Sequence, residues 1–170
     1  HMGSPTNNIT METYKSLKSH PLVDWTIPLS LGDSYRGHRV IATNKSFYEH
    51  YQFYGDKSLQ MREGKWSDGI FDVVIGSQVA NNLKHKLYDS IVLTHGISEE
   101  SIFKHDNSPF KIVGILKSTG TPVDKSLYIT LKGMEAMHIG WENGVPNFGQ
   151  PDQASLNKEN LKPSQITAFI

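Results

Sequence analysis

The sequence contains no cysteine among its 170 residues. This absence excludes disulfide bonds, thiolate catalysis and cysteine-ligated zinc. The chain also lacks a surplus of charge of either sign, with 17 Lys and Arg residues against 17 Asp and Glu residues. Because phosphate binding needs a basic surplus or a basic patch, we expect no nucleic-acid partner.

Long hydrophobic runs are absent as well. No stretch of the sequence approaches the roughly 18 consecutive apolar residues that a membrane-spanning helix requires. No secretory signal peptide is recognisable, and residues 1–4 (His-Met-Gly-Ser) are interpreted as a cloning scar. We therefore expect the chain to be a piece of a longer protein.

The motifs of the common enzyme classes are missing. The sequence has neither the phosphate-binding pattern G-x-x-x-x-G-K-[ST] nor the dinucleotide-binding pattern G-x-G-x-x-G, so we expect no ATP and no cofactor to bind. The serine-hydrolase pattern G-x-S-x-G is absent too. Ser77 follows a predicted strand and Gly76, but it lies one place too early for that pattern and is predicted as a helix N-cap. The sequence thus predicts no catalytic residue, and we expect that the chain is not an enzyme.

Histidine is the residue type that could still build a metal site. Apart from His1, the histidines are His20, His38, His50, His85, His95, His105 and His138. None of them forms H-x-H or H-E-x-x-H. Glu135 and His138 could share a helix face and supply two ligands, whereas a closed site needs about four. His95 and His105 flank a polar segment and could converge. We predict no metal ligands, and a histidine site stays open as an alternative.

Short strands mixed with short helices predict an α+β fold. The clearest strand pattern alternates apolar and polar residues from Val23 to Leu31, and Pro28 within it favours an edge strand or a bulge. A turn is expected at Gly32-Asp33. Residues 110–116 are the most hydrophobic and predict a strand buried on both faces. Further strands are predicted at 39–43, 72–75, 90–94, 127–130 and 165–170, and helices are predicted to begin after Thr10, Asn44 and Gly76 and at Leu131.

The predicted core surrounds the strand at 110–116. It contains Ile112, Val113, Ile115, Leu116, Val74, Val79 and Leu83. Trp25 is assigned to the core because it lies on the apolar side of its predicted strand. The other large aromatic residues in predicted loops are expected to contact a partner. This possible partner surface consists of Trp66, Trp141 and Phe103.

Residues 118–124 (Ser-Thr-Gly-Thr-Pro-Val-Asp) predict a structured turn. Gly120 can adopt a positive φ, and Pro122 presets its own φ. The Asp124 carboxylate or the threonine hydroxyls can accept hydrogen bonds from the turn amides. We expect this segment to have a structural role and no catalytic one.

Several segments match consecutive motifs of one protein family. Residues 72–83 (DVVIGSQVANNL) are similar to its strand-glycine-helix segment, and residues 110–116 (FKIVGIL) are similar to its most hydrophobic strand. Residues 118–129 carry the "tGtp.D..vyv" pattern of a subset, which residues 27–37 (IPLSLGDSYRG) also resemble. The family consists of ABC-transporter permeases of the MacB/FtsX type, and the part resembled is their periplasmic domain.

One step of the family pattern is only half present. Asp89 matches the "G-D-x-I" step that begins a strand, but Tyr88 stands where the family usually has glycine. The resemblance as a whole extends from about Val23 to Ile170, and its specificity comes from the order and spacing of the pieces.

The resemblance implies a domain organisation. In the family, a β-rich subdomain with short helices is inserted in a porter-like βαβ part. Applied to this chain, it implies a fragment of the porter-like part over residues 5–44 and the β-rich inserted subdomain over residues 45–160. A strand over residues 161–170 would return to the porter-like part, which would be partly truncated.

The resemblance also implies a function. The chain would be a non-catalytic periplasmic domain that binds a substrate or a periplasmic partner protein and relays ATP-driven conformational change across the bacterial inner membrane. Its partners would be a cytoplasmic ATPase subunit, reached through the membrane part of the permease, and a second permease copy. The competing hypothesis is a stand-alone periplasmic module that binds a metal through histidines or a glycan through tryptophans.

Overall fold

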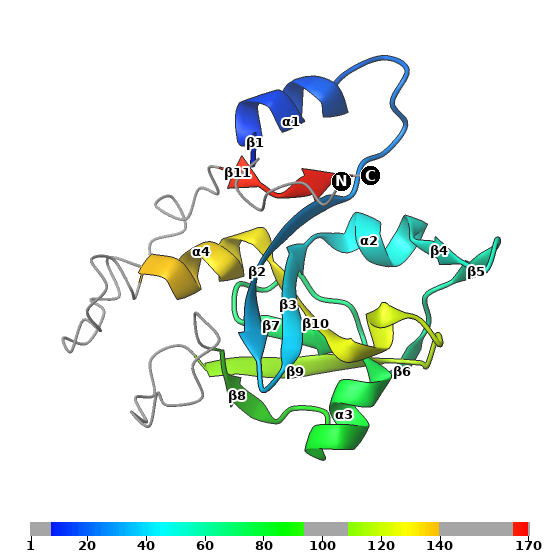
Figure 1. Ribbon diagram of the computed structural model, residues 1–170, viewed down its shortest axis with the longest axis vertical. Helices are drawn as coiled ribbons and strands as arrows, with labels where there is room; N and C mark the ends of the chain where they lie inside the picture. Colours follow the sequence, from blue (N-terminus) through cyan, green and yellow to red (C-terminus); the bar gives the residue numbers. More distant parts are fainter. Residues whose placement is uncertain (1–7, 94–108, 140–164, 170) are drawn as a thin grey trace.

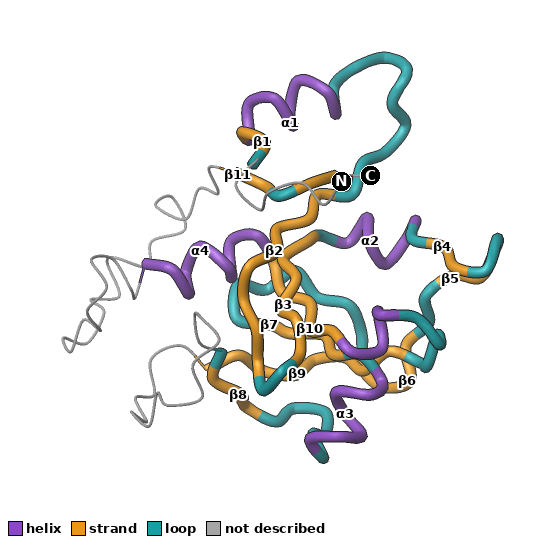
Figure 2. Tube along the Cα trace, in the orientation of Figure 1, coloured by secondary structure: helices purple, strands orange, loops and turns teal. Residues whose placement is uncertain are grey.

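The computed structural model describes residues 8–93, 109–139 and 165–169. Short strands and helices alternate along the chain, as expected for the α+β fold (Figures 1 and 2). The strands are β1 (Ile9–Thr10), β2 (Pro28–Tyr35), β3 (His38–Thr43), β4 (Gln52–Phe53), β5 (Lys57–Ser58), β6 (Met61–Gly64), β7 (Asp72–Ile75), β8 (Ser90–Val92), β9 (Pro109–Leu116), β10 (Ser126–Thr130), β11 (Gln165–Ile166) and β12 (Ala168–Phe169). The helices are α1 (Met11–Lys18), α2 (Lys45–His50), α3 (Ser77–Leu83), α4 (Leu131–Ile139) and the short 3-10 helix η1 (Pro122–Lys125).

None of the helices in the described ranges combines the length and the hydrophobicity that crossing a membrane requires.

A mixed eight-stranded sheet forms the centre of the molecule. Its main path runs β12-β2-β3-β10-β7-β9-β6, and β8 pairs with β9 beside this path. The pairs β3–β10 and β7–β9 are parallel, and the other neighbours are antiparallel. Strands from both sides of the predicted boundary at residue 44 therefore share one sheet. The proposed division into a porter-like part and an insert stays a prediction.

Two smaller pairings complete the strand arrangement. β4 and β5 form a hairpin next to α2, and β1 pairs with β11 at the end of the molecule where α1 lies (Figure 1). The β1–β11 pairing places Ile9 opposite Ile166, so the first and last described segments lie side by side.

The core is divided between the two faces of the sheet. Successive residues of a strand point to opposite faces, so Val73 and Ile75 belong to one buried cluster and Val74 belongs to the other. Helices α3 and α4 contribute to the first cluster. Helix α2 contributes Phe47 to the second, where it packs on Tyr128. Each face of the sheet thus has its own helical cover.

The predicted core is confirmed around β9. The exposed fractions of Ile112, Ile115 and Leu116 are 0%, 1% and 0%, and those of Val74 and Val79 are 2% and 0%. The remaining two predicted core residues, Val113 and Leu83, are partly buried and pack against the clusters.

The strand prediction for Val23–Leu31 is wrong in its first half. The strand begins at Pro28, which is a tolerated position because the first residue of a strand needs no ladder N–H. It is paired on both sides, by β12 and β3, and is not an edge strand. Trp25 precedes the strand, is 44% exposed and stacks on His50 with ring centroids 4.6 Å apart. The apolar residues that alternate before Pro28 therefore lie in a loop, where Trp25 stacks on His50 and Ile27 is buried in the core.

The predicted turn at Gly32-Asp33 is also wrong. Gly32 lies inside β2, where the register shifts between Leu31 and Asp33 as in a β-bulge. The chain reverses instead at Arg36 and Gly37, whose φ angles are 46° and 80°. Two positive φ angles in a two-residue connection are typical of the type I′ turn that joins twisted antiparallel strands.

Helix starts were predicted more accurately than strand starts. Thr10 caps α1 by accepting a hydrogen bond from the Thr13 N–H, and the Asn44 side chain caps α2 by accepting from the Ser46 N–H. The N-cap of α3, however, is Gly76, and Ser77 is the first helical residue. A Cβ at position 76 would overlap backbone atoms of Val123 and Asp124, so the close approach of α3 to this segment requires glycine.

Shortening the core side chain of Ile115 tests the packing of β9. We expect Ile115→Ala to lower the free energy of unfolding by about 2–5 kcal/mol, because the lost methyl groups leave a cavity between the sheet and its cover. Urea titration followed by circular dichroism measures this change. Val92→Ala is the matched control, since Val92 is a strand residue that is 44% exposed and should change stability by less than about 0.5 kcal/mol. An unfolding midpoint of Ile115→Ala equal to that of the unmodified chain would contradict the prediction.

Candidate functional site

The Asp124 carboxylate organises the turn between β9 and β10. Its side chain is 0% exposed. Oδ1 accepts hydrogen bonds from the Thr119 N–H and hydroxyl, both at 2.8 Å. Oδ2 accepts from the Gly120 N–H at 2.9 Å and from the Ser118 hydroxyl at 3.0 Å. Four donors around one carboxylate fix the conformation of residues 118–124, as the sequence predicts.

These hydrogen bonds also determine the ionisation of the carboxyl group. Burial by itself raises the pKa of Asp124, because it removes water from the charged form. The donors of Thr119, Gly120 and Ser118 outweigh burial and hold the pKa below its ordinary value. The group is therefore a stable anion near neutral pH, suited to a structural role and not to proton transfer.

The same turn is joined to the β4–β5 hairpin. The Tyr54 hydroxyl donates to the Gly120 carbonyl oxygen at 3.1 Å. Gly120 has a φ of 72°, and a Cβ at this position would lie 3.2 Å from the Tyr54 hydroxyl. Glycine at position 120 thus provides both the left-handed backbone and the room for the tyrosine.

An open cavity of about 630 Å³ lies between the hairpin and the turn. From the hairpin side it is lined by Phe53, Asp56 and Lys57, and from the other side by Gln60, Lys117 and residues 118–119. The Lys57 ammonium lies 5.9 Å from the centroid of the Tyr54 ring. The Lys117 Nζ donates to Gln60 Oε1 at 3.3 Å. The two lysines therefore approach the cavity from separate segments.

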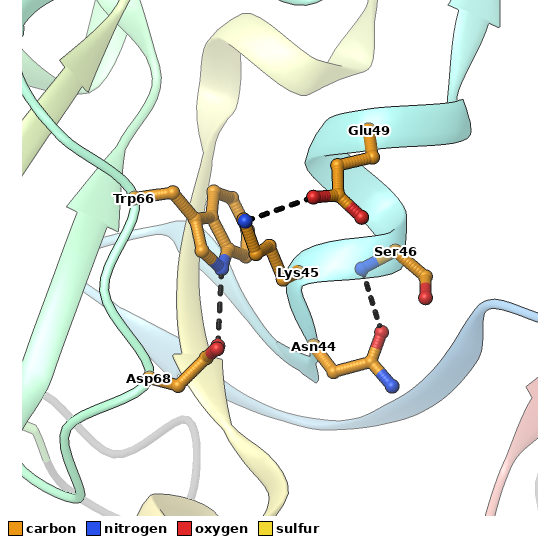
Figure 3. Close-up of polar contacts among 6 residues, drawn as sticks. All are labelled: Asn44, Lys45, Ser46, Glu49, Trp66 and Asp68. Carbon is orange, nitrogen blue, oxygen red and sulfur yellow. Dashed lines mark hydrogen bonds and ion pairs between the residues drawn. The ribbon is translucent and has the colours of Figure 1, made fainter.

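Trp66 occupies an aromatic cluster and is not a freely exposed loop residue. Its ring lies against Phe47, Tyr48 and Tyr128, with centroid distances of 6.2, 5.7 and 6.1 Å. Figure 3 shows its indole beside α2, where the Nε1–H donates to Asp68 Oδ1 at 3.2 Å. The Lys45–Glu49 ion pair on α2, with a 2.9 Å separation, appears in the same view.

Trp66 is the one residue of the predicted partner surface that lies among the described residues. Trp66 is partly buried, so one side of it supports the packing of α2 and the remainder faces solvent. Phe103 and Trp141 lie outside the described residues. A contact role for Trp66, Trp141 and Phe103 stays a prediction.

The histidines within the described ranges belong to no group of three or more His, Asp or Glu side chains that could hold a metal ion. His85 instead accepts or donates a hydrogen bond at 3.2 Å with the Tyr35 hydroxyl and lies 3.6 Å from the Asp89 carboxylate. His95, His105 and the side chain of His138 lie outside the described residues. The absence of a metal stays a prediction.

Sequence reasoning missed the hairpin wall of the cavity. The sequence predicts that the helix after Asn44 carries Phe47, Tyr51 and Tyr54 on one side, but α2 ends at His50 and Tyr54 lies between β4 and β5. The hydrogen bond from Tyr54 to Gly120 joins residues far apart in the sequence. A local signal was nevertheless present, because Tyr54-Gly55 contains the glycine that a tight turn needs, and both residues have positive φ.

Removing the charge of Asp124 tests the role of the carboxylate. We expect Asp124→Asn to lower the free energy of unfolding by at least about 2 kcal/mol at neutral pH, because the amide leaves buried donors without an acceptor. Urea titration at several pH values measures the effect. Since the folded-state pKa is lowered, the stabilisation is present above about pH 4 and is lost as pH falls through the folded pKa.

The difference in the free energy of unfolding between Asp124→Asn and the unmodified chain should therefore become smaller at acidic pH. Asp56→Asn is the matched control, because Asp56 is exposed and its substitution should leave stability within about 0.5 kcal/mol. If the free energy of unfolding of Asp124→Asn differs from that of the unmodified chain by the same amount well below about pH 4, the charge of Asp124 does not stabilise the fold.

Known proteins resemble the chain in structure and not in sequence. Scans against protein-family models and curated proteins found no match. Among solved structures, the periplasmic region of MacB from Actinobacillus actinomycetemcomitans aligns with a TM-score of 0.53 at 11% identity, over 96% of this chain and 78% of that one. The extracellular domain of the noncanonic ABC-type transporter YknZ from Gram-positive bacteria aligns with a TM-score of 0.50 at 15% identity, over 92% and 80%.

At these identities the comparison establishes the fold, and both solved structures are parts of ABC-type transporters that lie outside the cytoplasm. The family resemblance of the sequence is thus confirmed at the level of structure. This chain has the α+β fold of the extracytoplasmic domains of ABC-type transporter permeases.

Proposed function

We propose that the chain is the extracytoplasmic domain of an ABC transporter permease in a bacterial inner membrane and works without catalysis. It binds a substrate or a periplasmic partner protein and relays ATP-driven conformational change across the membrane. The observation that carries this proposal is the structural alignment with the MacB and YknZ domains over more than nine-tenths of the chain.

The chemistry of the described residues supports a role without catalysis. The Asp124 carboxylate is fully buried, and both of its oxygens accept hydrogen bonds from the turn that it stabilises. It has no free lone pair directed at a cavity in the way that a general base does. The lowered pKa of Asp124 is thus explained by the hydrogen bonds of the turn.

The proposal includes partners that lie beyond this chain. A cytoplasmic ATPase subunit supplies the energy, and a second permease copy completes the transporter. The relay requires that the domain move as a body or change its packing when the ATPase binds ATP. The sheet is covered on both faces, and such close-packed cores deform little. The domain is therefore suited to rigid-body movement.

The side of the membrane can be tested by thiol labelling, since the chain has no cysteine of its own. Asn82 is exposed on α3, so Asn82→Cys in the full-length, otherwise cysteine-free parent protein should react with a membrane-impermeant maleimide added to spheroplasts. It should be protected in inside-out vesicles. The matched control is Ala42→Cys, which is 0% exposed and should react only after denaturation. Labelling of Asn82→Cys from the cytoplasmic side alone would refute the proposed location.

The relay can be tested with the same variant. A spin label on Asn82→Cys in each of two permease copies reports the distance between the domains by pulsed electron resonance. We expect the distance distribution to shift when ATP is bound with hydrolysis blocked, because the proposed mechanism couples the ATPase to this domain. Identical distributions with and without ATP, in a transporter whose ATPase is active, would oppose a relay role.

A further inference from the structure

We propose that the cavity between the β4–β5 hairpin and the Asp124 turn binds an oxyanion, namely a carboxylate or phosphate group carried by a larger molecule. This inference goes beyond the proposed function and does not depend on it. It rests on Lys57 and Lys117, which line one cavity from separate segments and form no ion pair with a described carboxylate. Lys57 lies over the ring of Tyr54, and Lys117 donates to Gln60.

No carboxylate in the described part of the chain forms an ion pair with either lysine. The ion pairs in the described ranges are Lys45–Glu49, Arg62–Glu63 and His85–Asp89, and neither Lys57 nor Lys117 takes part in one. An ammonium group has three donors, and Lys117 uses one of them on Gln60. Both lysines therefore retain charge and hydrogen-bonding capacity for a ligand.

The positions of these ammonium groups are restricted before any ligand arrives. The Lys57 ammonium lies over the ring of Tyr54, an arrangement that is favourable for a cation. The Tyr54 hydroxyl is bonded to Gly120, which ties the wall that carries Lys57 to the turn. The Lys117 N–H donates to the Gln60 carbonyl at 2.8 Å and fixes the opposite wall. Such preorganisation reduces the entropy lost on binding.

Some of the other polar groups of the lining are already engaged within the protein or oppose an anion. The hydroxyls of Ser118 and Thr119 donate to Asp124, so their single protons are not free for a ligand. Asp56 is an acidic residue of the lining and opposes an anion, which leaves one net positive charge from Asp56, Lys57 and Lys117 together. Removing the Asp56 charge should therefore strengthen anion binding.

The size of the cavity indicates what carries the anionic group. Its volume of about 630 Å³ is typical of pockets that take small organic molecules and exceeds the space of a lone phosphate ion. Phe53 lines the same cavity and offers apolar surface to the carbon part of such a ligand. The cavity thus suits a molecule with one acidic group and an uncharged remainder.

Nuclear magnetic resonance titration of the isotope-labelled chain tests this site. Inorganic phosphate and N-acetyl-dialanine are added in separate experiments up to about 50 mM, at constant ionic strength so that general screening does not change. We expect saturable shifts of the amide signals of residues 57–60 and 117–120. Saturation by phosphate alone identifies a phosphate group as the ligand, and saturation by the peptide identifies a carboxylate.

Charge variants then distinguish the site from general attraction to the surface. We expect Lys57→Gln and Lys117→Gln each to weaken binding about two- to fivefold, because exposed charge pairs contribute little individually, and the double variant to weaken it further. Asp56→Asn should strengthen binding by a similar factor. Lys111→Gln is the matched control, since Lys111 is an exposed lysine of β9 outside the cavity lining and should leave the affinity unchanged.

Two results would overturn the proposal. One is the absence of saturable shifts with either probe. The other is equal affinity of the unmodified chain and the Lys57→Gln, Lys117→Gln double variant, in protein whose spectrum shows an intact fold. Neither result bears on the thiol-labelling test, so failure of the anion site is distinguishable from failure of the proposed transporter function.

Discussion

The hydrogen bonds to the Asp124 carboxylate hold the segment on which neighbouring parts of the molecule are built. The turn that they fix ends in β10, whose Ser126 carbonyl accepts from the Gly76 N–H at 2.9 Å at the start of α3. Gly76 also packs so closely on residues 123–124 that a side chain would not fit. On the other side, Gly120 holds the Tyr54 hydroxyl. One buried charge thus positions a helix, a central strand and a hairpin, and the hydrogen bonds that it accepts offset the cost of its desolvation.

Different side chains of this region stabilise the turn and line the cavity. The side chains of Ser118 and Thr119 point their protons at Asp124 and stabilise the fold. Lys117, which precedes them in the sequence, and Lys57 of the hairpin line the cavity. The proposed relay function requires a surface whose shape is maintained while the domain moves. A turn closed by its own carboxylate provides such a surface.

The sequence predicted those elements whose signals are local. The Asp124 turn, the caps Thr10 and Asn44, and the apolar strand β9 each depend on residues within a few positions of one another, and all were found. Other failures concern pairing over long distances. β6 is short and polar, so only its distant partner β9 defines it. Trp25 resembles a core residue by pattern, but its partner is the ring of His50, which sequence spacing does not reveal. The cavity and its lysines escaped notice for the same reason, because its walls come from different segments.

The strand order also governs the sequence of events when the chain is synthesised. The hairpin of β2 and β3 closes through a two-residue turn and can form early. Its two outer edges, however, are completed by β10 and β12, which come from much later in the chain. Until those strands leave the ribosome, the hairpin carries unpaired N–H and C=O groups on both sides, a condition that favours association with other chains. β2, with Pro28 at its start and a bulge at Gly32, is a poor template for such association. The nascent domain therefore tolerates a long interval between its first hairpin and its finished sheet.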